Sequence, residues 1–224
     1  GKKKKILDLG CGEGYTLKFF LEKKHDCYGV DFSDYAIKSQ NIKTYKKIKF
    51  MKTNLEKNGI PFKSKFDVII AKNLLEHVKD YYGVLKKISK SLKKNGLFIA
   101  TVPNDDSLIF NTYLKKENIR FNQAPFIFPR EHFRYFSKDT FIKSITKTTQ
   151  FKKIKVLSSF PIEIFILNKT TNYYKFTKFG PEANKIRILF MNLILENFGS
   201  HSIDILDSFS KIGVGRELIG IFKK

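Results

Sequence analysis

The chain has 224 residues and a formal net charge of +22, from 43 lysine and arginine residues against 21 acidic ones. This length supports one domain with an ample core. A charge of this size points first to nucleic acid as a partner. Only five of the basic residues are arginine, however, and sites that bind phosphate or bases favour arginine, so the composition disfavours a nucleic-acid substrate.

The first apolar run, residues 6–9, ends abruptly in the glycine-rich stretch 10–14. Such a run is typical of a strand buried on both faces, and the glycines let the backbone turn tightly beside a flat ligand. Residues 16–24 then have the apolar spacing of a helix. This order of strand, glycine loop and helix predicts the first half of a nucleotide-binding unit. Asp31 ends a second apolar run, where an acidic residue can accept both hydroxyls of a ribose.

Strands and helices alternate along the rest of the chain, which predicts an α/β fold. Further strands are expected at 48–52, 66–71, 97–102, 152–157 and 217–222, and helices at 34–44, 81–92, 107–118, after Ser137, at 182–197 and at 202–212. Ser33 is expected to cap the helix at 34–44, and Asn95-Gly96 to stop the helix at 81–92.

Residues 158–214, between the sixth and seventh strands, are expected to form a helical insertion. Its helix at 182–197 is apolar around most of its circumference, so we expect it to be buried. Two roles stay open for this insertion: it covers the substrate side, or it forms a contact in a homodimer.

Four motifs resemble those of class I S-adenosylmethionine-dependent methyltransferases and follow in that family's order: ILDLGCGEGY, GVDFS, FDVIIAKNLLEHV and LKKNGLFIATVPN. The glycine pattern G-x-G-x-G differs from the dinucleotide fingerprint G-x-G-x-x-G. The resemblance covers nearly the whole chain and implies a single methyltransferase domain over residues 1–224.

The resemblance also implies a Rossmann-like seven-stranded sheet in the order 3-2-1-4-5-7-6, with strand seven antiparallel and helices on both faces. Strands three and six are the edges in this order. Those are the two strands that interleave lysine with apolar residues, as edge strands do. Strand seven is nearly all apolar, which is typical of an interior strand.

The cofactor implied by the resemblance is S-adenosylmethionine, with S-adenosylhomocysteine as its product. The residues expected to bind it are Asp8, Gly10, Cys11, Gly12, Gly14, Asp31, Phe32, Asn54, Leu55 and Ala71. Where the family commonly has an acidic residue facing the adenine amino group, this chain has Asn54. Its amide oxygen can still accept from that group, and Leu55 can pack against the ring. The alternative is that Asn54 only makes a turn.

Methyl transfer from a sulfonium needs alignment in a closed site, and a hydroxyl acceptor must also lose its proton. Two histidines are candidates for the base. His77 follows the fourth strand at the carboxyl edge where such sheets bind ligands, and His132 lies in an aromatic loop after the fifth strand. Alternatively, His77 orients its loop and His132 holds a packed corner. No pair of histidines has the spacing of metal ligands, so no metal is expected.

The C-terminal half contains PREHFRYFS, FPIEIFILN and IGVGRELIGIFKK. These stretches resemble small-molecule methyltransferases of surface-polysaccharide and lipopolysaccharide biosynthesis. The resemblance implies a sugar hydroxyl as acceptor, on a nucleotide sugar or a lipid-linked glycan. A quinone-ring O-methyltransferase shares the GCGEG and LEH elements and is the alternative. An RNA methyltransferase and a non-catalytic cofactor-binding module are further alternatives.

Membrane and export signals are weak in this chain. No apolar run approaches the ~20 residues of a transmembrane helix, and the basic start at 2–5 enters the first strand without the pattern of a signal peptide. Cys11 and Cys27 make no disulfide framework, so we expect a cytoplasmic protein. The family usually has helices before the first strand, so we expect a substrate-covering segment to precede Gly1.

Overall fold

A computed structural model of the chain describes residues 2–33, 47–124, 127 and 130–224. Its strands are β1 (Lys5–Leu9), β2 (Asp26–Asp31), β3 (Lys49–Lys52), β4 (Phe66–Lys72), β5 (Leu92–Pro103), β6 (Lys152–Ser158) and β7 (Glu217–Lys223). Its α-helices are α1 (Tyr15–Glu22), α4 (Leu55–Asn58), α5 (Tyr81–Ser91), α6 (Leu108–Lys116), α7 (Lys138–Thr149), α8 (Gly180–Phe198) and α9 (Ser202–Lys211). Short 3-10 helices are η1 (Leu75–His77), η2 (Phe121–Gln123), η3 (Ile162–Leu167), η4 (Thr177–Phe179) and η5 (Gly199–His201). The helix expected at 34–44 lies outside the described residues.

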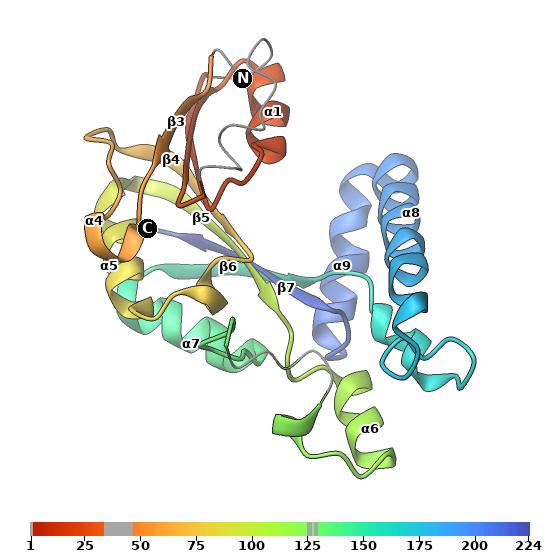
Figure 1. Cartoon of the computed structure of the whole chain (residues 1–224). Coiled ribbons are helices and arrows are strands. Elements are labelled where there is room, and N and C mark those ends of the chain that lie inside the picture. The colour runs from red at the N-terminus through yellow and green to blue at the C-terminus, as the bar shows by residue number, and fades with distance from the viewer. Residues whose placement is uncertain (1, 34–46, 125–126, 128–129) are drawn as a thin grey trace. The chain divides into compact units, whose positions relative to one another are not determined.

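The strands form a sheet in the order β3-β2-β1-β4-β5-β7-β6, with β7 antiparallel (Figure 1). Strand β1 pairs in parallel with β2 and β4, β2 with β3, and β4 with β5. The predicted fold class and strand order are confirmed. The two strands that interleave lysine, β3 and β6, are the edges, where lysine discourages pairing with another chain.

Strand β5 begins at Leu92, whereas the sequence predicted a start at residue 97. Phe66 of β4 pairs with Leu92 and Val68 pairs with Leu97, so residues 93–96 bulge out of the ladder. Asn95 has a φ of 63°, and its N–H donates to the carbonyl of Lys224. The Asn95-Gly96 pair therefore makes a bulge within β5 and is not the stop of α5, which ends at Ser91.

The chain divides into two compact units, each with a core of its own. The first unit consists of residues 1–102, 142–154 and 220–224, and the second of 103–141 and 155–219. One apolar cluster of the first unit joins α1 to the strands through Ile6, Cys11, Leu17, Cys27, Ile48, Val68 and Ile70. The second unit packs α6, η3 and the start of α8 through Phe110, Tyr113, Leu114, Ala124, Ile162, Ile166, Tyr173 and Ala183. The prediction of a single methyltransferase domain over 1–224 stays a prediction.

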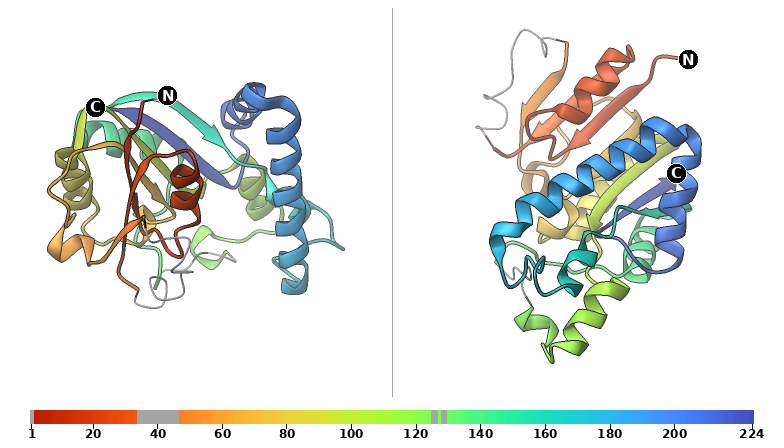
Figure 2. Two further views of the ribbon diagram at one scale, coloured as in Figure 1. Left: turned by 90° about the horizontal axis from the view of Figure 1, so that it is seen from above. Right: turned by 90° about the vertical axis from the view of Figure 1, so that its right-hand side faces the viewer.

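Helix α8 lies beside α9 in the second unit (Figure 2). Its exposed apolar side chains are Ile186, Ile188, Leu189, Leu193, Leu195 and Phe198, and Leu189 reaches 67% exposure. The expectation that this helix is buried is therefore wrong. One stripe of α8 packs inward, where the Phe190 and Phe160 rings lie 4.7 Å apart, and its apolar residues continue beyond that stripe. Neither α8 nor another helix in the described ranges is long and apolar enough to cross a membrane.

Gly29 of β2 has no space for a side chain. A Cβ there would lie 2.8 Å from Cys11 Sγ and from Phe50 Cδ1, and 2.9 Å from Leu17 Cδ1. We expect Gly29→Ala to lower the free energy of unfolding by about 1–3 kcal/mol, because a packed core must shift. In the control Gly180→Ala, the new Cβ meets nothing within 4 Å apart from its chain neighbours, so the loss of stability should be clearly smaller than for Gly29→Ala. Urea unfolding measures both variants, and wild-type stability of Gly29→Ala would contradict this packing argument.

Candidate functional site

The loop after β1 is tied to the end of β2 by backbone hydrogen bonds. The N–H groups of Gly10 and Cys11 both donate to the Val30 carbonyl, at 2.9 and 3.0 Å. The Gly12 N–H donates to Oδ2 of Asp31 at 2.9 Å. Left-handed φ angles of 70°, 49° and 82° are adopted by Gly10, Gly12 and Gly14. Glycine takes up this backbone region at no steric cost, so the glycines permit the turn that brings the loop to Asp31.

The Asp31 carboxylate is held in place at both oxygens. Oδ2 accepts from Gly12, and Oδ1 accepts from the N–H of Ser33 at 2.8 Å. Each carboxylate oxygen can accept a further hydrogen bond. The carboxylate is thus fixed in orientation and keeps acceptor capacity for the two hydroxyls of a ribose.

A cavity of about 250 Å³ opens in the first unit beside this loop. Its wall is formed by Gly10, Asp31, Phe32, Thr53, Asn54, Leu55, Glu56, Leu74, His77 and Val78. Five residues expected to bind the cofactor therefore lie on one cavity, together with one candidate base. An apolar wall with a few polar groups is usual for a small-molecule site. Leu74 and Val78 were not among the residues expected to bind the cofactor, although they flank the LEH motif.

The other residues expected to bind the cofactor do not line this cavity. Asp8, Cys11, Gly14 and Ala71 are buried, and Gly12 is half-buried. Asp8 is the second-last residue of β1, and Ala71 of β4 pairs with Leu9 at the end of that strand.

Asn54 acts as the N-cap of α4. Its Oδ1 accepts from the N–H groups of Glu56 and Lys57, both at 3.0 Å. A carbonyl oxygen has two lone pairs, so the cap uses both of them. The oxygen that the sequence offered to an adenine amine is therefore already engaged, and the amide N–H groups are the donors that Asn54 can offer to a ligand. Asn54 thus caps a helix and also lies on the cavity wall.

The candidate base His77 ends the short helix η1. Its N–H donates to the Leu74 carbonyl at 3.0 Å, and its Nε2 lies 3.8 Å from Oε1 of the buried Glu76. Leu74 also packs against the glycine loop. Its side chain is so near that a Cβ added to Gly10 would lie 3.3 Å from Leu74 Cδ1. The LEH segment is therefore connected to the loop that follows β1.

The candidate base His132 lies in the second unit and is half-buried. Its ring centroid is 6.1 Å from that of Tyr135. Burial, together with the nearby Asp105 carboxylate, raises the pKa of Tyr135. Tyr135 lines an aromatic cavity of about 260 Å³, whose other walls are Asp105, Asp106, Asn111, Phe121, Phe136, Ser137 and Thr140. His132 is thus next to a wall residue of a cavity that has both aromatic and polar groups.

The segment after His132 is fixed at the start of α7. Ser137 Oγ accepts from the Thr140 N–H at 3.2 Å, which caps the helix. The Phe136 and Phe141 rings lie 5.8 Å apart, across the cap, as in a hydrophobic staple. This staple holds the chain beside Tyr135 in one direction.

Comparison with known proteins identifies the family. Residues 1–156 match a family model described as a methyltransferase domain. The chain belongs to this family. It is 36% identical over 100 residues to a ubiquinone biosynthesis O-methyltransferase of Pelagibacter ubique, which covers 44% of this chain and 42% of that protein. The chain thus spans less than half the length of such curated relatives.

Two further likenesses extend over most of the chain. An uncharacterised protein of Methanocaldococcus jannaschii is 31% identical over 191 residues, 85% of this chain and 75% of that one. The crystal structure of an S-adenosylmethionine-dependent methyltransferase from Mesorhizobium loti has a TM-score of 0.60 at 14% identity, over 99% of this chain and 91% of that chain. At this identity the structural likeness shows the fold alone. Family and fold together identify S-adenosylmethionine as the cofactor of this methyltransferase.

The residues of the first unit fit that cofactor. Asp31 presents a fixed carboxylate on the cavity, as a ribose requires. The glycine backbone approaches the cavity closely, since Gly10 lines it without a side chain. Asp8 Oδ1 is buried and has no hydrogen-bond partner among the described residues. A buried carboxylate with an unused oxygen suits a cationic ligand group.

Asp8 gives this methyltransferase a pH-dependent stability. Burial raises the pKa of Asp8 from 3.8 to about 7, with Lys72 lowering it and Asp31 raising it further. The pKa of Asp8 is higher in the folded state than in the unfolded state. The stability that protonated Asp8 contributes is therefore complete below about pH 4 and is lost as the pH rises through about 7. We expect Asp8→Asn, which cannot ionise, to raise the free energy of unfolding by on the order of 2–4 kcal/mol at about pH 8 and by little at about pH 4.

Urea unfolding of the cofactor-free protein at these two pH values measures the difference. An equal effect of Asp8→Asn at both pH values would contradict the raised pKa.

Proposed function

We propose that this methyltransferase moves a methyl group from S-adenosylmethionine to a hydroxyl of a small molecule, a sugar hydroxyl on a nucleotide sugar or lipid-linked glycan being the favoured acceptor. The observation that carries the proposal is the cavity of the first unit. Residues from separate motifs, Gly10, Asp31, Asn54 and His77, line that one cavity. Their types match the needs of a nucleoside with a charged tail.

The chemistry needs few groups from the protein. The bound cofactor supplies a methyl on a sulfonium, whose carbon–sulfur bond breaks as the acceptor oxygen forms its bond to that carbon. Asp31 holds and orients the ribose, and the glycine backbone lies against the ligand. Phe32, Leu55 and Leu74 supply apolar surface to the cavity wall. The remaining task is to remove the hydroxyl proton, which goes to a base of the protein.

His132 is the proposed base, with His77 as a second candidate or as a residue that positions the cofactor. His132 lies beside Tyr135, and Tyr135 lines an aromatic cavity with carboxylates and an amide, which supports the assignment of His132 to the acceptor. The position of His77 on the cavity with Asp31 supports a role nearer the cofactor. Asp8, Cys11, Gly12, Gly14 and Ala71 are proposed to support the binding loop.

The acceptor class separates two candidate functions. The mixed polar and aromatic cavity around Tyr135 supports a sugar, since a sugar needs donors and acceptors as well as an apolar face. The name of the relative from Pelagibacter ubique favours a quinone ring instead. Incubation with methyl-labelled cofactor and panels of sugars, quinols and RNA tests the proposal. A one-methyl mass gain on a sugar supports it. Labelled quinol or RNA, or no labelled product, would contradict it.

Assembly and compartment are also proposals. The exposed apolar residues of α8 support a contact with a second copy of the chain as the role of residues 158–214. Cys11 and Cys27 are free thiols, and both are buried. Free thiols fit a reducing compartment, so the cytoplasm stays our expectation.

Asp31 is expected to determine cofactor affinity. Asp31→Asn keeps the shape of the side chain but removes the charged acceptor for the ribose, so we expect S-adenosylmethionine binding to weaken by about 1.5–3 kcal/mol. Calorimetry measures the affinity. The matched control is Asp26→Asn at the start of the same strand, where the carboxylate pairs with Lys3 at 2.7 Å on the surface. The control should bind like wild type, and equal affinities for all three proteins would refute the role of Asp31.

His132 is expected to affect turnover and not cofactor binding. With a working acceptor, His132→Ala should lower turnover by ~10²-fold, because the hydroxyl loses its base. His77→Ala should weaken both cofactor binding and turnover, since His77 lies on the cofactor cavity. The exposed His201 provides the control, and His201→Ala should leave both unchanged. Wild-type turnover of His132→Ala would leave His77 as the base, or no base at all.

A further inference from the structure

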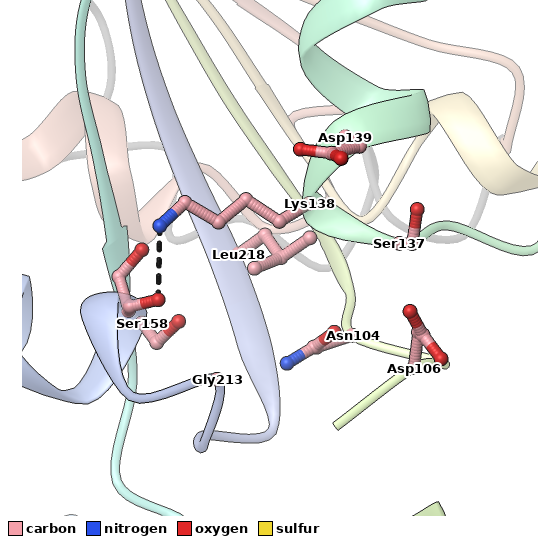
Figure 3. A pocket seen from close by; sticks show the side chains of 9 residues that line it. Asn104, Asp106, Ser137, Lys138, Asp139, Ser158, Gly213 and Leu218 are labelled. Atoms are coloured by element: carbon pink, nitrogen blue, oxygen red, sulfur yellow. Dashed lines mark hydrogen bonds between the residues drawn. The ribbon is translucent and has the colours of Figure 1, made fainter. Parts of the chain in front are cut away.

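The second unit has a polar cavity besides the aromatic one. Its volume is about 170 Å³. Asn104 reaches it from the end of β5, Lys138 and Asp139 from the start of α7, Ser158 from the end of β6 and Ser210 from α9 (Figure 3). A single ordered water needs only about 10–15 Å³ of such space. The cavity is therefore roughly ten times larger than a bridging water requires.

Two buried hydroxyls on its wall lack partners. Ser158 is 1% exposed and Ser210 2% exposed, and neither Oγ atom has a hydrogen-bond partner within the described ranges. A buried hydroxyl without a partner is unfavourable, and native structures rarely leave one unsatisfied. Both serines line the same cavity, so a ligand that donates and accepts hydrogen bonds there would satisfy both.

A cation and an oriented amide complete the polar wall. Lys138 Nζ donates to the Ser210 carbonyl at 2.9 Å, which uses one of the three donors of an ammonium group. Asn104 Nδ2 donates to the Gly215 carbonyl at 2.9 Å, which fixes the orientation of its amide. The wall thus offers donors and acceptors in fixed positions.

The charge of the wall selects among ligand classes. The wall carries one ammonium, Lys138, and two carboxylates, Asp106 and Asp139. This balance is unfavourable for a phosphate or a carboxylate. A neutral group that carries several hydroxyls can donate to the carboxylates and accept from the ammonium. The wall chemistry therefore favours a polyhydroxylated group.

The polar cavity shares two wall residues, Asp106 and Ser137, with the aromatic one. Phe121 and Tyr135 of the aromatic cavity pack edge to face with their rings 5.4 Å apart. Aromatic side chains of the kind that cover the apolar face of a sugar therefore lie near the polar wall.

We propose that this cavity is a binding site for one neutral sugar ring of the methyl acceptor, with Ser158, Ser210 and Lys138 as its hydrogen-bonding partners. The proposal rests on the proposed function, in that the bound sugar is taken to belong to the acceptor. It adds to that function a set of specificity residues that carry no methyl-transfer role.

Saturation-transfer NMR with a panel of neutral hexoses tests the site on the full chain, and line broadening in the phosphorus NMR signal of inorganic phosphate is the anionic comparison. We expect at least one hexose to bind and phosphate not to bind. Ser158→Ala and Lys138→Met should each weaken hexose binding tenfold or more, because each removes a wall partner. The matched control is Ser208→Ala, on the exposed face of α9, which should bind like wild type. Ser158→Ala removes an unsatisfied buried hydroxyl, so it is not expected to unfold the protein.

Calorimetry with S-adenosylmethionine on the same variants separates the two proposals. Unchanged cofactor binding with weakened hexose binding supports the sugar site. Absence of hexose binding, preference for phosphate, or equal hexose binding by Ser158→Ala, Lys138→Met and wild type would overturn it. Failure of the wild-type chain to bind S-adenosylmethionine would instead count against the proposed function.

Discussion

The hydrogen bond from the Gly12 N–H to the Asp31 carboxylate is the constraint on which the first unit depends. It forms because β1 and β2 pair in parallel, with Leu9 opposite Val30, so both strands end at the same edge of the sheet. It also requires a left-handed backbone at Gly12, with a φ of 49°. The bond places the glycine loop and an oriented carboxylate side by side, and the cavity of this unit opens there.

Both units bury ionisable groups at some cost to stability. In the first, burial raises the pKa of Asp8 to about 7. In the second, Glu163 is fully buried, its Oε1 lies 3.9 Å from Arg216 Nη1, and burial raises its pKa. A buried ion pair of this length adds little stability, because desolvation offsets its attraction. Such groups are retained where they orient a ligand or hold one arrangement of the core.

The two units differ in how much sequence motifs say about them. The family match covers residues 1–156, and the cofactor motifs lie within the first unit. The second unit carries the aromatic cavity beside Tyr135, the polar cavity beside Ser158 and the exposed helix α8. A shared fold does not specify an acceptor, so the choice of substrate depends on these side chains.

The amino-acid sequence alone determined the glycine loop and its acidic partner Asp31, because those features follow from a local apolar run, glycine positions and a fixed spacing. The strand order came from the resemblance of four motifs to a known family, and the lysines of β3 and β6 agreed with it. Tertiary structure decided the rest. Asn95-Gly96 forms a bulge in β5 because pairing with β4 and Lys224 acts there, and a helix stop has the same local signature. Helix α8 is exposed because only one stripe of its apolar residues packs against other residues of the second unit. The polar cavity joins Asn104, Ser158 and Ser210, which lie far apart in the chain, and a single serine or asparagine carries no periodic signal that would bring them together.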